Sequence, residues 1–294
     1  MADTLNAPAL GRQNRNSFWY RFRSRPSAVI GMTLLALLVI SALLAPVIAP
    51  DAPNSQDWMN RLKPPGPEHW FGTDAYGRSV LTRVLYGGRV SLISGILPVI
   101  IGLTVGTTLG IIAGYMGKTT DRFIMRVMDV LLAFPGLLLA LAIIGTLGPG
   151  LMNAVLAIGV GMIPTFARLS RAEVLNYKTA DFVEAANALG ARAPRIILRH
   201  LLPSMTSPLV VQATISVGAA ILSTAGLSFL GLGVQPPTSD WGEMLASGRR
   251  YLPGAWWLAV FPGLMIALTV LSFNLLGDGL RDALDPRTQL RRRK

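Results

Sequence analysis

Long uncharged runs dominate the pattern of this chain of 294 residues. A membrane-spanning helix needs about 20 predominantly apolar residues, whereas a helix on the surface of a soluble protein is apolar along one face only. The pattern therefore predicts an all-α protein that crosses a membrane several times. The uncharged runs that support this prediction cover residues 29–49, 90–117, 130–167, 201–239 and 251–277.

The third run is too long for a single span. Its 38 residues would form a helix of about 57 Å at about 1.5 Å per residue, nearly twice the thickness of the hydrocarbon layer. Gly148, Pro149 and Gly150 offer a turn, so we divide the run there. We expect six spanning helices, the third beginning among Arg126 and Asp129, at about residues 29–50, 91–116, 124–146, 151–167, 208–233 and 255–278.

Charge adds an orientation to this picture. Hydrophobic residues make up 51% of the chain and charged residues 14%, yet the net charge is +12. With six spans both termini lie on one side of the membrane. The segments on that side contain 20 Lys and Arg and 9 Asp and Glu, so their net charge is +11 of the total +12. Such an excess marks the cytoplasmic side, so we attribute it to topology and expect no binding of nucleic acid. The segments counted are residues 1–28, 117–129, 168–207 and 278–294.

Several kinds of chemistry are missing from the sequence. The chain has no cysteine, and its two histidines fall on opposite sides of the membrane, so we expect no metal site and no catalytic residue. The stretch "GYMGKTT" lacks the first glycine of a phosphate-binding loop, because Ile112 stands there. No ionisable residue lies in the middle of a predicted span. We interpret Asp129 as a helix-end residue one turn from Arg126, so coupling to an ion gradient is not expected.

Glycines recur every fourth residue in the second predicted span. Residues four apart lie on one face of a helix, and glycine there lets a second helix backbone approach closely. We predict tight packing against a neighbour, either in this chain or in another one. Prolines at positions 98, 135, 164 and 262 predict kinks in or near the spans. The glycines of the stripe are Gly102, Gly106, Gly110 and Gly114.

A polar segment, residues 181–203, interrupts the apolar pattern. Asp181 and Glu184 have the spacing of a capping box, and Phe182, Ala185, Ala186 and Leu189 would share one apolar face. Gly190 is suited to end this helix in the left-handed conformation, Pro194 to begin a second one, and Pro203 to end it. We predict two short helices joined by a tight corner, either lying on lipid or docking a cytosolic partner.

This segment resembles the EAA loop of bacterial ABC importer permeases. Glu184, Ala185, Ala186, Gly190, Leu202 and Pro203 carry the resemblance. Longer stretches are similar to the second permease subunit of the dipeptide, oligopeptide and nickel importers. They are residues 69–92, 121–140, 227–245 and 273–287, and the similarity extends from about residue 18 to residue 287.

The resemblance implies a type I ABC importer permease fold in the bacterial inner membrane. It implies a heterodimer with a paralogous permease, two ABC ATPase subunits that bind ATP and magnesium, and a periplasmic or lipid-anchored solute-binding protein. The expected cargo is a small peptide, with glutathione, an opine or a nickel chelate as alternatives, and the substrate-binding residues are not identified. It also implies that Asp181, Glu184, Ala185, Ala186, Gly190, Arg195 and Pro203 couple the permease to the ATPase.

The same reading divides the chain and assigns its outer face. Asp240 and Glu243 have capping-box spacing and predict a short external helix. Trp58, Trp70, Trp241, Trp256 and Trp257 lie near the outer face, as interfacial aromatic residues do. We expect a cytoplasmic tail (1–28), a first span (29–50), a periplasmic segment (51–90), a permease core (91–278) and a basic cytoplasmic tail (279–294).

Two other functions compete with this interpretation. A gradient-driven carrier or channel would transport without ATPase subunits, but the sequence offers no intramembrane charge for it. A membrane subunit with a purely structural role would tolerate substitutions that face the transport path.

Overall fold

The computed structural model describes residues 18–284, so the outer parts of both predicted tails lie outside the described range. Every regular element within it is helical. The longer helices are α2 (Pro26–Leu43), α4 (Val80–Met116), α5 (Lys118–Leu132), α6 (Gly136–Leu147), α7 (Leu151–Lys178), α10 (Leu202–Phe229) and α12 (Trp257–Leu284). Shorter helices are α1 (Phe18–Arg23), α3 (Ala45–Ile48), α8 (Asp181–Ala188), α9 (Ala193–Ile196) and α11 (Trp241–Gly248).

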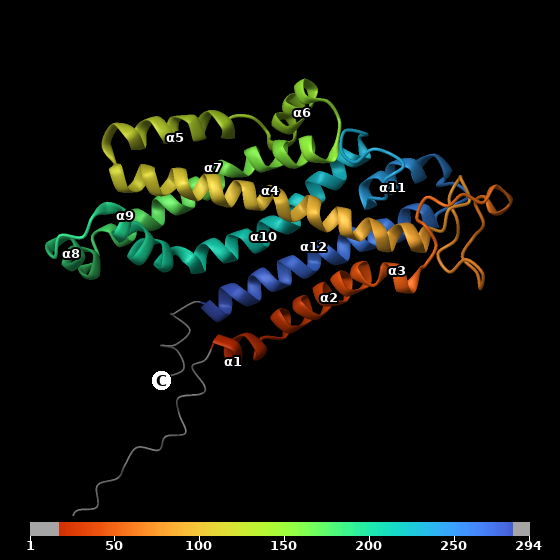
Figure 1. Ribbon diagram of the computed structural model, residues 1–294, viewed down its shortest axis with the longest axis horizontal. Coiled ribbons are helices and arrows are strands. Elements are labelled where there is room, and N and C mark those ends of the chain that lie inside the picture. Colours follow the sequence, from red (N-terminus) through yellow and green to blue (C-terminus); the bar gives the residue numbers. More distant parts are fainter. Residues whose placement is uncertain (1–17, 285–294) are drawn as a thin grey trace, which may run out of the picture.

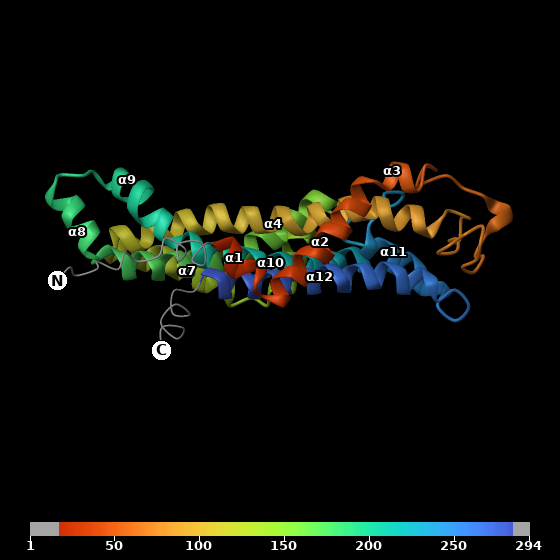
Figure 2. The same ribbon diagram turned by 90° about the horizontal axis from the view of Figure 1, so that it is seen from below.

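The long helices lie roughly along one axis and form an elongated bundle (Figure 1). α4, α7 and α12 run in one direction, and α2 and α10 run in the other. Consequently α8 and α9 lie at one end of the bundle, called here the α8 end. α11 and the segment 51–79 lie at the opposite end, the α11 end (Figures 1 and 2). The two ends of the bundle are therefore built from different segments of the chain.

The expected all-α membrane fold is confirmed. Five helices are long and apolar enough to cross a membrane, and the pair α5 and α6 would make a sixth span. The prediction of one continuous third helix over 124–146 is wrong, because the chain bends by 90° between α5 and α6. Pro135 explains the break, since proline lacks an N–H and disfavours helical backbone in the residue before it.

Several helices extend beyond the predicted spans. α4 begins at Val80 instead of residue 91, where the Ser79 hydroxyl accepts a hydrogen bond from the Thr82 N–H. α7 continues to Lys178 instead of ending at residue 167. Runs without charge therefore marked the membrane-embedded parts of these helices and not their ends, because a helix continues past the lipid wherever other protein packs against it.

The glycine stripe of α4 packs against α7 of the same chain. A Cβ atom at Gly102 would lie 2.7 Å from the Met162 Cβ, and one at Gly106 would lie 2.8 Å from the Phe166 Cβ. Further along, a Cβ at Gly110 would lie 2.8 Å from Ser170, and one at Gly114 would lie 2.9 Å from Val174. Real Cβ atoms essentially never come so close to such neighbours. The two backbones therefore approach each other more closely than any side chain on the stripe would allow.

Candidate functional site

The α8 end carries the segment that resembles the EAA loop. α8 is anchored by Val183, whose side chain is fully buried, and α9 by Ile196, which is also fully buried. The apolar face predicted for this helix is largely exposed: Phe182 is 43% exposed, Ala185 is exposed and Leu189 is 88% exposed. Helical periodicity identifies an apolar face, but it does not distinguish packing against the own bundle from packing against another molecule. The structure leaves this face open.

Gly190 forms the corner between the two short helices. Its φ is +76°, in the left-handed region predicted for it. The Gly190 N–H donates to the Asn187 carbonyl at 2.9 Å, and the Ala191 N–H donates to the Ala186 carbonyl at 3.0 Å. This pair of bonds is the Schellman arrangement that ends many helices. A Cβ at Gly190 would meet nothing within 4 Å, so the backbone conformation alone constrains this position.

The predicted capping box at the start of α8 is wrong. Ala180 is the N-cap residue, and no side chain caps the helix. Asp181 and Glu184 lie in the first turn, where their carboxylates are exposed and interact favourably with the helix dipole. The Asp181 and Glu184 carboxylates are therefore accessible to a partner that binds at this end of the bundle.

The second short helix is not a separate element. α9 continues through a π-helical turn, Ile197–Leu201, directly into α10, and the Leu202 N–H donates to the Ile197 carbonyl. Pro203 was predicted to end the helix but lies in the first turn of α10. The π turn shifts the register of the backbone hydrogen bonds immediately before Pro203. The helix therefore continues although proline has no N–H to donate. Arg195 lies exposed on α9, near the start of the helical run that continues into α10.

Ion pairs connect α5 to α7 near this end. Arg171 binds Asp121 at 2.5 Å, and Arg168 donates to the Asp129 carboxylate at 2.7 Å. The interpretation of Asp129 as the partner of Arg126 is therefore wrong. Residues one turn apart in α5 compete with residues across the helix interface, and here Arg168 of α7 takes the carboxylate. Asp129 is thus paired and is not an isolated charge.

At the α11 end, Asp240 organises α11, and the short helix predicted to follow this residue is confirmed. One Asp240 carboxylate oxygen accepts hydrogen bonds from the Gly242 and Glu243 N–H groups at 3.1 and 3.2 Å. The other accepts a bond from the Ser91 hydroxyl at 2.6 Å. Asp240 therefore begins α11 and fastens it to α4.

Glu243 does not complete the capping box but binds Arg83 of α4. The Arg83 guanidinium donates to the Glu243 carboxylate at 2.9 Å and lies 3.8 Å from Asp74, which also accepts from the Arg78 Nε at 2.6 Å. Burial raises the pKa of the Glu243 carboxyl, while the positive charges of Arg83 and Arg78 oppose this shift. Sequence reasoning missed this network, since its members come from separate segments with no common spacing.

Two tryptophans at this end are structural. Trp241 and Trp257 are each 3% exposed, and their indole N–H groups donate to the carbonyls of Val84 and Thr73. Their assignment as interfacial anchors is therefore wrong, because buried hydrogen-bonded rings cannot contact headgroups. Trp58, Trp70 and Trp256 are more than half exposed, as interfacial residues would be.

An apolar groove of about 820 Å³ runs along the side of the bundle between α4 and α10. Isoleucine, leucine and valine side chains line most of it, interspersed with threonines. The hydroxyls of Thr104, Thr108, Thr206 and Thr214 donate to carbonyls of their own helices.

Within residues 18–284, no group of three or more His, Asp or Glu side chains is arranged to hold a metal ion.

Comparison with known proteins decides the family. The model of the binding-protein-dependent transport system inner membrane component matches residues 106–290, and the model of the N-terminal transmembrane domain of oligopeptide transport permease C matches residues 15–65. The chain belongs to this family of transport permeases. It is accordingly a multi-pass protein of the inner membrane, whose family works in ABC importers together with ATPase and binding-protein partners.

Relatives cover nearly the whole permease. It is 46% identical over 260 residues to the dipeptide transport system permease protein DppC of Alkalihalophilus pseudofirmus, with 88% of this chain and 86% of the relative covered. It is 49% identical over 273 residues to the glutathione transport system permease protein GsiD of Escherichia coli, with 92% and 90% covered.

A solved structure supports the fold. An inward-facing form of the MetNI methionine ABC transporter matches with a TM-score of 0.55 at 22% identity, covering 69% of the permease and 96% of that chain. At this identity the likeness concerns the fold alone, and it agrees with the type I importer architecture predicted from the sequence.

Proposed function

We propose that this permease forms half of the translocation path of an ATP-driven importer that carries small peptides into the cell. The observation that carries the proposal is the identity of 46–49%, over about nine tenths of the chain, to permeases named for dipeptide and glutathione transport. Glutathione is itself a small peptide, so both relatives point to one chemical class. None of the described residues favours an opine or a nickel chelate.

The energy for transport comes from other subunits in this proposal. The first glycine of a phosphate-binding loop is replaced by Ile112, and Asp129 is paired with Arg168, which supports a subunit that takes its energy from its partners. We therefore infer a non-catalytic subunit without a cofactor, and two partner ATPases that bind ATP and magnesium. The exposed apolar face of α8 and the uninterrupted helical run from α9 into α10 support docking of an ATPase at the α8 end.

The remaining partners follow from the two ends of the bundle. The basic excess of the sequence supports a cytoplasmic α8 end and cytoplasmic termini. A periplasmic or lipid-anchored solute-binding protein would then meet the α11 end. A paralogous permease would complete the pore as a heterodimer.

Uptake by the reconstituted complex tests the proposal. The permease pair and its ATPases are placed in proteoliposomes with the binding protein outside, and entry of a radiolabelled dipeptide is measured with ATP inside. We expect uptake that ceases when the ATPases are inactivated by mutation. Uptake that continues with inactive ATPases would instead identify a gradient-driven carrier. Competition by unlabelled glutathione distinguishes the two candidate cargoes.

A further inference from the structure

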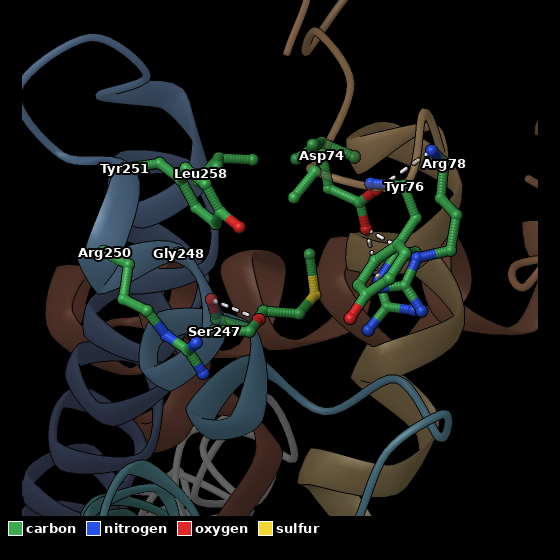
Figure 3. A pocket seen from close by; sticks show the side chains of 12 residues that line it. Asp74, Tyr76, Arg78, Ser247, Gly248, Arg250, Tyr251 and Leu258 are labelled. Carbon is green, nitrogen blue, oxygen red and sulfur yellow. Dashed lines mark hydrogen bonds and ion pairs between the residues drawn. The ribbon is translucent and has the colours of Figure 1, made fainter. Parts of the chain in front are cut away.

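A small polar cavity opens at the α11 end, between the segment 74–83 and the helices α11 and α12. It has a volume of about 80 Å³. Three of the residues that line it are arginines, Arg78, Arg83 and Arg250, and one is an aspartate, Asp74. Figure 3 shows Arg78 and Arg250 on opposite sides of the cavity.

Two of these arginines have donors to spare. Arg78 is only 7% exposed, and its Nε binds Asp74, but its two terminal nitrogens form no hydrogen bond with any described residue. Instead its guanidinium lies 4.7 Å from the centre of the Tyr76 ring. The Arg250 guanidinium forms no hydrogen bond or ion pair within residues 18–284 and is exposed. Arg83, in contrast, is engaged by Glu243.

The charged residues that line the cavity are mostly basic. Arg78, Arg83 and Arg250 contribute three positive charges, and Asp74 contributes one negative charge. Glu243 lies outside the lining and is engaged by Arg83. Asp74 is already occupied, because its oxygens accept bonds from Tyr76 and Arg78. The free guanidinium donors of Arg78 and Arg250 therefore remain on opposite sides of the cavity. A single carboxylate matches this arrangement, because guanidinium groups bind carboxylates through paired N–H bonds.

The position of the cavity selects the source of the carboxylate. The cavity opens at the α11 end, where the proposed function places the solute-binding protein. An acidic side chain on the surface of that protein would reach this opening when the two proteins dock.

We propose that this cavity receives an aspartate or glutamate side chain of the solute-binding protein, whose carboxylate is bound by Arg250 and Arg78. The proposal rests on the proposed function, since it requires that a binding protein docks at the α11 end. Arg78 is held in place by Asp74, and Arg250 completes the site from the other wall. The contact would align the binding protein with the permease before the cargo is released.

Charge reversal at Arg250 tests the inference in the reconstituted complex. ATP hydrolysis is measured against the concentration of the loaded binding protein that supports uptake by the wild type. For Arg250→Glu we expect the half-saturating concentration to rise about tenfold or more, with the same maximal rate, because an interfacial charge pair is replaced by repulsion. Higher salt should raise the wild-type value and change that of the variant less.

Arg249→Glu is the matched control. This substitution changes the charge by the same amount one residue away. Arg249, however, lies over the Phe229 ring and does not line the cavity. We expect at most a small shift for it. Equal shifts for both variants, or none for Arg250→Glu, would overturn the carboxylate site while leaving the proposed function intact. If no binding protein stimulates the wild type, the proposed function fails and this inference fails with it.

Discussion

Single residues control the geometry at both ends of the bundle. Gly190 turns the chain between α8 and α9 in a conformation that side chains with a Cβ rarely adopt. Asp240 holds the start of α11 and binds α4 through Ser91. In both cases one residue determines where a short helix points.

The first prediction concerns Gly190. Gly190→Val should lose most uptake and most stimulation of ATP hydrolysis by the binding protein, because a β-branched residue strains the left-handed corner and redirects α8. Membrane insertion and yield should remain normal, since no residue packs against this position. Gly190→Asn is the control, because asparagine tolerates this conformation and should keep most activity. Wild-type stimulation in Gly190→Val would remove the coupling role from the loop.

The second prediction concerns Asp240. Asp240→Ala should destabilise the permease by about 1–3 kcal/mol, because two N–H groups and the Ser91 hydroxyl lose their buried acceptor. Asp240→Asn retains a capping oxygen and should be milder. Thermal unfolding of the purified protein in detergent measures the difference. Equal melting temperatures for Asp240→Ala and the wild type would show that the cap does not hold this end.

At the scale of elements, two helix relationships matter most. The glycines of α4 meet successive turns of α7 in ascending order, so these helices pack as parallel neighbours over several turns. At the α8 end, α9, the π turn and α10 form one continuous helix. A displacement of the loop would therefore be passed to a membrane-spanning element through continuous helical backbone.

The third prediction tests the packing of α4 on α7. Gly106→Leu should lower the yield or assembly of the complex, because a side chain there would overlap Ile163 and Phe166. Overpacking of this kind costs about 1–3 kcal/mol. Gly145→Leu in α6 is the matched control, since a Cβ there meets nothing within 4 Å. Assembly is measured by size-exclusion chromatography, and intact assembly of a Gly106→Leu and Gly110→Leu double variant would refute the packing role.

The whole molecule separates two tasks along its axis. Exposed apolar and charged side chains gather on α8 and α9 at one end, where an ATPase is proposed to dock. A buried network of charges joins α4, α11 and the segment 51–79 at the other end. We expect the first end to transmit motion and the second to stay rigid as a platform for the binding protein.

The fourth prediction concerns the orientation of this axis. The chain has no native cysteine, so single introduced cysteines report their side of the membrane directly. Cysteine at the exposed position Ser55 should react with an impermeant thiol reagent added outside intact cells. Cysteine at the exposed position Thr179 should react only after the membrane is permeabilised. The opposite labelling pattern would reverse the assignment of the two ends.

The sequence by itself determined the features that depend on local chemistry. Uncharged runs identified the five helices that are long and apolar enough to cross a membrane, because lipid excludes charge from a span wherever it occurs. The left-handed corner at Gly190 and the cap at Asp240 were also predictable, since both depend on neighbours within a few residues. The EAA-like pattern was sufficient to indicate the family that the comparisons then showed.

Only the tertiary structure decided which distant groups meet. Arg83 and Glu243 are 160 residues apart, and no periodicity links them, so their pairing could not be read from the chain. The same holds for Asp129, where Arg168 of α7 takes the place expected for a neighbour in the same helix. The apolar pattern of α8 also did not show whether its apolar face is exposed or buried, and the structure shows it exposed. Local sequence specifies what each segment is able to contact, and the packing of the helices selects the partner.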